Sequence, residues 1–480
     1  MPEVAHVSFL NRTVHNLREV WRDMAERTSG IFSAVPAPSL PDKDLELLKT
    51  QMRDCLEARG GEVSARSRAA NLGRTYLSLN AQGRKRFLRV LAHDFDIDRT
   101  AVDEAVAALH QPDLSIAGRI STEQTLRKVL QPPRVRLLTQ FNGLPEGIRF
   151  LVDLRAELLA LCRDDPELEA LEKDLKGLLE SWFDVGFLEL RRITWDSPAS
   201  LLEKLIEYEA VHAIESWDDL KKRLDTDRRC FAFFHPRMPD VPLIFVEVAL
   251  VSGMAESIQT LLNEEEPVLD ANAADAAIFY SISNTQEGLA GISFGNFLIK
   301  RVVDLLATEF KGLKIFATLS PIPGFRTWLI KELDAMSPEE EEPTFLTSAE
   351  RRALAALPAQ GEAKGKLRAT LEGSTNWHEN PEWVKAMKGP LMRYCARYLV
   401  QQKRPSGIAY DRVAHFHLSN GARVERLNWL ANTAPEGLAQ SLGLMVNYRY
   451  KLADIENNHE AYTGEGRVRV SSAVRGLLRG

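Results

Sequence analysis

The spacing of apolar residues predicts helices over the first part of the chain. In residues 44–61, DLELLKTQMRDCLEARGG, apolar positions recur every three or four residues, and Gly60-Gly61 predicts the end of that helix. Residues 166–183, PELEALEKDLKGLLESWF, repeat the pattern, with Pro166 at the expected helix start. Because long β-branched runs are rare here, the pattern predicts an all-helical bundle over residues 1–182, and no residue in it suggests catalysis.

The pattern changes near Phe183. Short apolar runs, rich in β-branched and aromatic residues, now alternate with stretches of helical spacing. These runs are CFAFF (230–234), PLIFVEVAL (242–250), AAIFYSIS (276–283) and LKIFATLS (313–320). Such alternation predicts a mixed α/β domain over residues 183–480.

Three further features organise this second domain. Residues 345–402 return to helical spacing and predict a helical insertion, and the last strands are expected from about residue 413. The acidic segment 337–343, SPEEEEP, is typical of a solvated surface loop. The expected fold class is therefore α+β/α/β, an N-terminal helical bundle followed by a mixed α/β domain.

Composition limits the classes of function. The chain has 480 residues, of which 45% are hydrophobic, enough for two or three buried cores. Its formal net charge of −6 gives no basic field for nucleic acid or an anionic membrane, so we expect neither partner. Any anionic ligand must be held by a local site.

The cysteines and the chain ends bear on the compartment. The four cysteines are scattered, without a C-x-x-C pair, which argues against a disulfide framework or a structural zinc site and fits a reducing compartment. The first residues lack an apolar run like that of a signal peptide, and the last four, LLRG, differ from the peroxisomal S-K-L signal. These features favour a cytoplasmic protein.

A glycine-rich segment offers one candidate ligand site. After the strand expected at 276–283 come Gly288, Gly291 and Gly295, and then a helix expected from about Asn296. A glycine loop that leads into a helix N-terminus leaves backbone N–H groups free to bind a phosphate. The spacing matches neither a P-loop nor G-x-G-x-x-G, and a simple tight turn is an equally good interpretation.

The helix expected after this loop is amphipathic. Leu298, Val302 and Leu305 are expected on one face, and Gly312 is expected as its C-cap.

The segment 319–325, LSPIPGF, offers a second candidate site. Two prolines stiffen the loop that follows a strand, and Ser320 lies at the C-terminal end of that strand, where open α/β sheets bind ligands. A serine that only begins a turn is the commoner case. Because the segment is not G-x-S-x-G, a hydrolase nucleophile is not indicated.

The segment 414–429, AHFHLSNGARVERLNW, offers a third. Asn420-Gly421 between alternating runs predicts a β-hairpin, which would place His415, His417 and Ser419 on one strand face. Two histidines could bind a metal, but no Asp, Glu or Cys stands close by to complete the set. A histidine on a strand is more often structural than catalytic, so this pattern alone leaves the choice open.

Taken together, these segments resemble the malonyl-CoA decarboxylase family. The residues that resemble it are YSISNTQEGLAGISFGNFLIKRVV (280–303), LSPIPGF (319–325), FHLSNGARVERLNWLA (416–431), GLMVNYRY (443–450), WFDVGFLELRRITWDSP (182–198) and PLMRYCARYLV (390–400). Any one of these blocks alone would be weak support for the resemblance, whereas the first four, found in the same order as in the family, are specific to it. Before residue 180 the likeness is only one of length and helical character.

The resemblance implies a fold and an activity. Family members have a helical domain followed by a domain similar to acetyltransferases that bind acetyl-CoA (GNAT type). They are lyases of fatty acid metabolism that convert malonyl-CoA to acetyl-CoA and CO2. The resemblance also implies coenzyme A binding and a homo-oligomer, for which a tetramer is one form. No cofactor and no metal are expected, because the carbonyl of the substrate can itself accept the electrons.

The resemblance also implies site residues. Ser320 and His417 match the catalytic pair, and Ser281 and Tyr450 match further active-site positions. The substrate loop matches Ala290, Gly291, Ile292, Ser293, Phe294, Gly295 and Asn296. Animal members have a glutamate where this chain has Ser293, so Ser293 is kept out of the catalytic set.

These residue types suit decarboxylation. Ser320 would donate a hydrogen bond to the malonyl group, and His417, with a near-neutral pKa, would protonate carbon across from it. Tyr450 and backbone N–H groups would stabilise developing charge. The alternatives are an acyl-CoA N-acyltransferase of the same domain type and an interaction protein that only senses acyl-CoA.

Overall fold

The computed structural model describes residues 21, 36–57, 61–183, 185–292, 298–335, 346–358, 363–372 and 376–479. The chain divides into two compact units. The helical unit comprises residues 1–189, 234–243 and 285–294, and the sheet unit comprises residues 190–233, 244–284 and 295–480. Within the described residues, no helix is long and apolar enough to cross a membrane.

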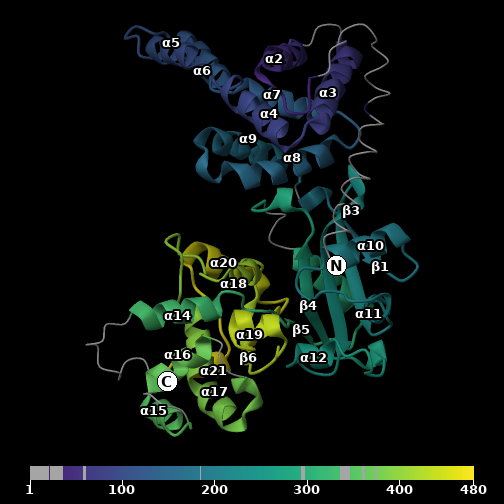
Figure 1. The fold of residues 1–480 in the computed structure, drawn as a ribbon, viewed down its shortest axis with the longest axis vertical. Helices are drawn as coiled ribbons and strands as arrows, with labels where there is room; N and C mark the ends of the chain where they lie inside the picture. Colours follow the sequence, from purple (N-terminus) through teal and green to yellow (C-terminus); the bar gives the residue numbers. More distant parts are fainter. Residues whose placement is uncertain are drawn as a thin grey trace. The chain divides into compact units, whose positions relative to one another are not determined.

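The helical unit confirms the helices expected from apolar spacing (Figure 1). Its helices are α2 (Asp42–Leu56), α3 (Gly61–Ser78), α4 (Ala81–His93), α5 (Arg99–Leu109), α6 (Ile116–Val129), α7 (Pro133–Asn142), α8 (Gly147–Leu161), η1 (Cys162–Asp164), α9 (Pro166–Trp182), η2 (Val185–Phe187) and η4 (Glu287–Leu289). Pro166 is the first residue of α9, and the Asp165 side chain caps that helix by accepting from the Leu168 N–H.

The expected glycine stop after α2 is wrong. That helix ends at Leu56, and Gly61 is the first residue of α3 instead. Gly60 lies outside the described residues. The apolar face ends earlier than the glycines, because Cys55 is the last buried residue of α2.

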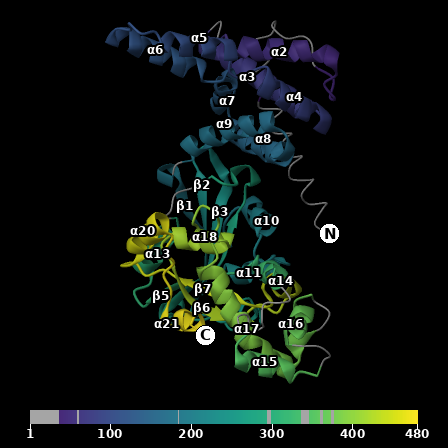
Figure 2. The ribbon, with the colours of Figure 1, turned by 90° about the vertical axis from the view of Figure 1, so that its left-hand side faces the viewer.

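The strands form one mixed, seven-stranded sheet, part of which can be followed in Figure 2. Its strands are β1 (Glu189–Ile193), β2 (Arg228–His235), β3 (Met238–Val251), β4 (Ala276–Asn284), β5 (Ile315–Thr318), β6 (Arg423–Asn428) and β7 (Met445–Arg449), in the order β1-β2-β3-β4-β5-β7-β6. Three of the four apolar runs lie wholly in strands, as expected, and of the fourth only Ile315–Thr318 forms a strand, β5. β4 and β5 are parallel, with Phe279 paired to Thr318, whereas β3–β4, β5–β7 and β6–β7 are antiparallel.

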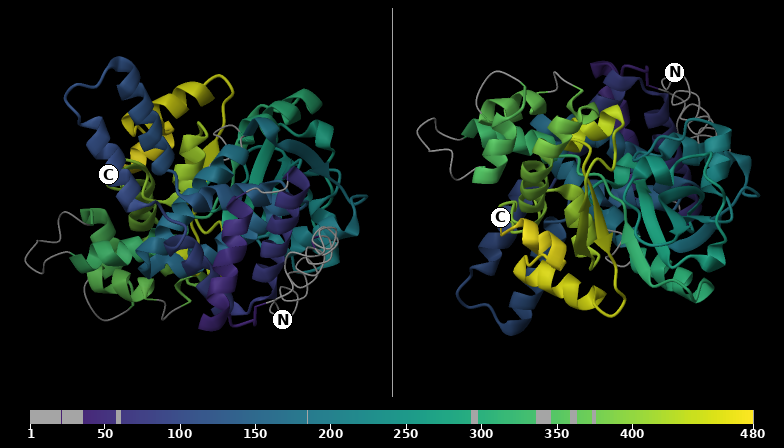
Figure 3. Two further views of the ribbon diagram at one scale, coloured as in Figure 1. Left: turned by 90° about the horizontal axis from the view of Figure 1, so that it is seen from above. Right: turned by 90° about the horizontal axis from the view of Figure 1, so that it is seen from below.

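The sheet unit also contains helices and short 3₁₀ turns. They are α10 (Ala199–Tyr208), α11 (Trp217–Arg223), α12 (Ile258–Leu261), η3 (Ala271–Ala273), α13 (Leu298–Glu309), α14 (Phe325–Ala335), α15 (Ser348–Ala355), α16 (Ala363–Leu371), η6 (Trp377–Glu379), α17 (Pro381–Val400), α18 (Arg412–Ser419), α19 (Pro435–Ser441), α20 (Ile455–Glu465) and α21 (Ser472–Leu477). Both α17 and α21 pack against β6 (Figure 3). α15, α16 and α17 confirm the helical spacing expected over residues 345–402, while the acidic segment 337–343 lies outside the described residues.

The hairpin expected at residues 414–429 is wrong. Residues 412–419 form the helix α18, and the last two strands begin only at Arg423. His415, His417 and Ser419 therefore do not share a strand face, because successive helical residues turn by about 100°.

A cap at its start and the burial of one face explain why this segment is helical. The Asp411 side chain accepts a hydrogen bond from the Ala414 N–H at 2.8 Å and so caps the helix. Ala414, His417 and Leu418 are buried at the i, i+3 and i+4 spacing of a helix. Gly421 (φ +81°) then supplies the left-handed residue just beyond the end, which Asn-Gly can do as readily as it forms a hairpin turn.

The helix α13 confirms an amphipathic element but differs in detail. Leu298 and Val302 are buried as expected, yet Leu305 is 39% exposed and Leu306 takes the buried position. The helix ends at Glu309, so Gly312 is not its C-cap. The expected start near Asn296 falls within 293–297, outside the described residues.

Candidate active site

Ser320 lies two residues beyond the C-terminal end of β5, close to where the sequence placed it. Its backbone N–H donates to the Val446 carbonyl at 2.9 Å, and its carbonyl accepts from the Val446 N–H at 3.0 Å. These two bonds fix the backbone of Ser320 to β7. The side chain is 5% exposed, so its position depends on its protein partners.

His417 and Ser320 are in direct contact. His417 Nε2 lies 3.1 Å from Ser320 Oγ, although 97 residues separate them. The other ring nitrogen, Nδ1, lies 2.8 Å from the hydroxyl of Tyr450. Three of the expected site residues thus form one continuous hydrogen-bonded group, which we call the Ser320–His417–Tyr450 group.

The contact corrects one detail of the expected geometry. With 3.1 Å between Ser320 Oγ and His417 Nε2, no acyl group fits between the two side chains. A substrate must therefore meet Ser320 from another side, or separate the pair.

Thr318 is a partner that the sequence did not reveal. Ser320 Oγ donates to Thr318 Oγ1 at 2.8 Å, and Thr318 Oγ1 also accepts the Tyr448 N–H at 3.1 Å. When the serine proton points to Thr318, Ser320 Oγ can accept from Nε2–H, and Tyr450 then donates to the bare Nδ1. The alternation of strand residues could have suggested Thr318, which lies two positions before Ser320.

Burial determines the protonation state of His417. The ring is 3% exposed and stacks on Tyr448, with 4.6 Å between ring centroids. Burial lowers the pKa of His417 to about 3 and raises the pKa of Tyr450 well above 10.0. The expectation of a near-neutral histidine pKa is therefore wrong, because the buried imidazole is neutral at pH 7.

The lowered pKa predicts an acid-dependent loss of stability. Between pH 6.5 and about 3, His417 binds a proton when the protein is unfolded but not when it is folded. Its contribution to the free energy of unfolding is therefore present above pH 6.5 and falls by about 1.4 kcal/mol per pH unit as the pH drops through this window. Urea unfolding from pH 7 to pH 5 should show a steeper loss in the wild type than in His417→Asn. Equal slopes would contradict a buried neutral histidine.

His415 has partners separate from those of His417. Its Nδ1 lies 2.9 Å from the Tyr462 hydroxyl, away from the partners of His417. Across the described ranges, no three His, Cys, Asp or Glu side chains gather as a metal site.

Ser281 belongs to a second hydrogen-bonded group. Its Oγ lies 2.8 and 2.7 Å from the two carboxylate oxygens of Glu209, a residue that the sequence did not single out. Oε1 of Glu209 also accepts the N–H groups of Val211 and His212, each at 2.7 Å. In the part of the chain that the structure describes, no hydrogen bond joins this group to Ser320.

A buried carboxyl lies beside Ser281. Glu247 on β3 is the register partner of Ser281 on β4, and it lies 3.3 Å from the Arg223 guanidinium. Burial raises the pKa of Glu247 to about 8, the negative charge of Glu209 adds to this, and Arg223 opposes it. Strongly shifted carboxyl groups of this kind are frequent at functional sites.

The expected substrate loop is described only in part. Ala290 and Gly291 are exposed, Ile292 is buried, and Gly291 has φ +72°, a conformation that favours glycine. Ser293, Phe294, Gly295 and Asn296 lie outside the described residues.

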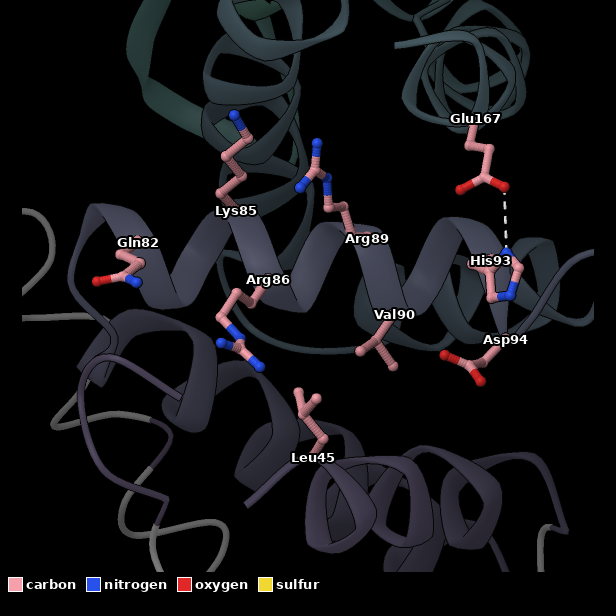
Figure 4. A pocket seen from close by; sticks show the side chains of 9 residues that line it. All are labelled: Leu45, Gln82, Lys85, Arg86, Arg89, Val90, His93, Asp94 and Glu167. Atoms are coloured by element: carbon pink, nitrogen blue, oxygen red, sulfur yellow. Dashed lines mark hydrogen bonds and ion pairs between the residues drawn. The ribbon is translucent and has the colours of Figure 1, made fainter. Parts of the chain in front are cut away.

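A pocket of about 660 Å³ also lies within the helical unit (Figure 4). It is lined by Leu45, Gln82, Lys85, Arg86, Arg89, Val90, His93, Asp94 and Glu167. Basic side chains that line this pocket already pair with carboxylates. His93 Nδ1 lies 3.1 Å from Glu167, and Arg89 pairs with Asp165 at 3.2 Å. None of the described site residues lines it, so we do not place the active site there.

Comparisons with known proteins identify the family. The model of the malonyl-CoA decarboxylase C-terminal domain matches residues 186–480, and that of the malonyl-CoA decarboxylase N-terminal domain matches residues 95–183. The two matches together define a two-domain decarboxylase. The mitochondrial malonyl-CoA decarboxylase of Anser anser anser is 40% identical over 421 residues, which cover 85% of this chain and 83% of that relative.

Solved structures agree with this assignment. Malonyl-CoA decarboxylase from Rhodopseudomonas palustris is similar with a TM-score of 0.80 and 42% identity, covering 90% of this chain and 99% of that chain. The enzyme from Agrobacterium vitis gives a TM-score of 0.77 and 41% identity over the same shares. The chain belongs to the malonyl-CoA decarboxylase family.

Proposed function

We propose that Ser320, His417 and Tyr450 catalyse the decarboxylation of malonyl-CoA in this chain. Family membership makes the chain a carboxy-lyase that forms acetyl-CoA and CO2. The observation that supports the residue assignment is the continuous hydrogen-bonded group, with 3.1 Å between Ser320 Oγ and His417 Nε2 and 2.8 Å between His417 Nδ1 and the Tyr450 hydroxyl.

The reaction sets what these residues must do. The bond between the carboxylate carbon and the central carbon of the malonyl group breaks, and CO2 leaves. The electron pair of the broken bond moves into the thioester carbonyl to give an enolate. The carbon of this enolate then takes one proton and becomes the methyl group of acetyl-CoA. The thioester itself accepts the electrons, so the mechanism that we propose needs no cofactor and no metal.

The proton is proposed to reach carbon through Ser320. Since Ser320 Oγ covers His417 Nε2, the histidine N–H faces the serine oxygen. A substrate that displaces the bond to Thr318 would receive the serine proton, and Nε2–H would replace it on Ser320. As Nε2 loses its proton, Nδ1 would take the proton of Tyr450, so the imidazole stays neutral, and Tyr450 would regain a proton from solvent before the next turnover. A neutral acid suffices because an enolate carbon is strongly basic.

The remaining site assignments extend this proposal. Residues 290–296 are proposed to hold acyl-CoA, and the exposed, left-handed Gly291 allows close approach of a ligand to the backbone. Ser281 is proposed as a further active-site residue, held by Glu209. The boundary proposed between a helical domain, 1–182, and a catalytic domain, 183–480, is supported by the ends of the two matching family models.

The catalytic domain is proposed to have the acetyltransferase-like (GNAT-type) arrangement. The support is the seven-stranded mixed sheet, in which β4 and β5 form a parallel pair within otherwise antiparallel neighbours. An acyl-CoA N-acyltransferase would have the same type of domain, but family membership does not favour that activity.

Assembly and location complete the proposal. We expect a homo-oligomer, such as a tetramer, to show in light scattering as a mass above the 54.0 kDa of one chain. The four cysteines are free, which supports a reducing compartment, and we propose the cytoplasm. A role in fatty acid metabolism would follow from the substrate and product.

A direct assay tests the activity. The purified protein should convert malonyl-CoA to acetyl-CoA and CO2 without an added acceptor, and equally well in EDTA, since the proposed proton path uses only side chains. Acetyl-CoA is measured by chromatography. Formation only with an amine acceptor would indicate a transferase, and loss in EDTA with recovery on adding zinc would contradict the metal-free mechanism.

A further inference from the structure

Arg155 of α8 is an arginine without access to solvent. Its side chain is 1% exposed. Nε and Nη2 donate to Oε1 of Glu172 on α9, at 2.9 and 2.6 Å. The third nitrogen, Nη1, donates to the backbone carbonyl of Gly288 at 2.6 Å. The guanidinium therefore joins two helices to the turn η4.

The turn η4 packs directly against α8 at Gly288. A Cβ on Gly288 would be 1.8 Å from the Val152 carbonyl oxygen, so only glycine fits. Gly288 and Leu289 are buried, whereas the next two residues, Ala290 and Gly291, are exposed. The helices thus anchor the buried residues Gly288 and Leu289, and the exposed loop residues Ala290 and Gly291 follow them directly in the chain.

The helix α9 approaches the exposed part as well. A Cβ on Gly291 would be 4.0 Å from Lys176 Cε, one helical turn beyond Glu172. One face of α9 therefore presents Glu172 to the anchor and Lys176 to the loop.

A buried ion pair adds little net stability, because desolvation opposes the attraction between the charges. The pair instead fixes the position of the turn. The planar guanidinium of Arg155 donates hydrogen bonds to Glu172 and to the Gly288 carbonyl at the same time, and a lysine ammonium cannot reproduce this geometry. We propose that Arg155 is a positioning residue through which the helical unit holds the start of the acyl-CoA loop. This inference rests on the proposed function, and within it on the described start of the loop, residues 290–292.

The test compares two anchors. Arg155→Lys should raise KM for malonyl-CoA, and the Kd for coenzyme A by calorimetry, by about tenfold, with kcat changed less than threefold. Arg134→Lys is the matched control. Arg134 is also buried and pairs with Asp174 on α9 at 2.7 Å, but its backbone acceptor is Ala92, far from the turn in sequence. The control should lower Tm similarly and leave KM unchanged.

A second variant covers the case in which Arg155→Lys does not fold. Gly288→Ala leaves the ion pair intact and pushes the turn off α8, so it should raise KM in the same way. An unchanged KM in a folded Arg155→Lys or Gly288→Ala protein, or an equal rise in Arg134→Lys, would overturn the inference. Wild-type protein without decarboxylase activity would instead overturn the proposed function.

Discussion

Replacing Ser320 by alanine or His417 by asparagine is expected to lower kcat for malonyl-CoA by about 100-fold or more. Each variant interrupts the path from Tyr450 through His417 Nε2 to Ser320 Oγ. The double variant should be little worse than the poorer single variant, because residues that act as one unit are not additive. Steady-state kinetics with malonyl-CoA measures all three.

His415→Asn is the control for this experiment. His415 lies two residues before His417 on the same helix and also contacts a tyrosine hydroxyl, that of Tyr462, at 2.9 Å. Its loss should leave kcat within about twofold, since it has no contact with Ser320 among the described residues. Losses of similar size in His415→Asn and His417→Asn, or modest additive losses at Ser320 and His417, would contradict the catalytic assignment.

Gly421→Ala is expected to lower both stability and activity, because Gly421 ends the helix that holds His417. Its φ is +81°, and an added Cβ would be 2.3 Å from the Ile455 carbonyl oxygen. Strain and a backbone collision together should lower the free energy of unfolding by about 3 kcal/mol. The Ala422 N–H donates to the His417 carbonyl at 3.1 Å, so the displacement reaches the catalytic histidine. Urea unfolding and kcat are measured together.

Gly464→Ala provides the comparison. Gly464 lies within α20 and a Cβ there would meet nothing within 4 Å. Alanine should stabilise this helix by about 0.5–1 kcal/mol without changing kcat. If Gly421→Ala had equally mild effects, the close approach of Gly421 to α20 would not position His417.

The sequence predicted the elements whose apolar pattern is unambiguous. The apolar, β-branched run at 242–250 was expected as a strand, and β3 includes all of it. Pro166 marked the start of α9 because proline suits the first helical turn. Family resemblance, rather than spacing, selected Ser320 and His417 from two ordinary-looking segments.

Tertiary structure decided the rest. Asn420-Gly421 suits a hairpin turn and a helix end equally well, and the cap from Asp411 and the burial of His417 and Leu418 favour the helix. The protonation of His417 was also beyond the sequence, because its pKa of about 3 results from burial. By itself the sequence determined that a helical region precedes a mixed α/β region and placed the four strands β2 to β5, since periodicity is local. Which side chains meet, as Ser320 meets His417 and Ser281 meets Glu209, depends on contacts between distant segments.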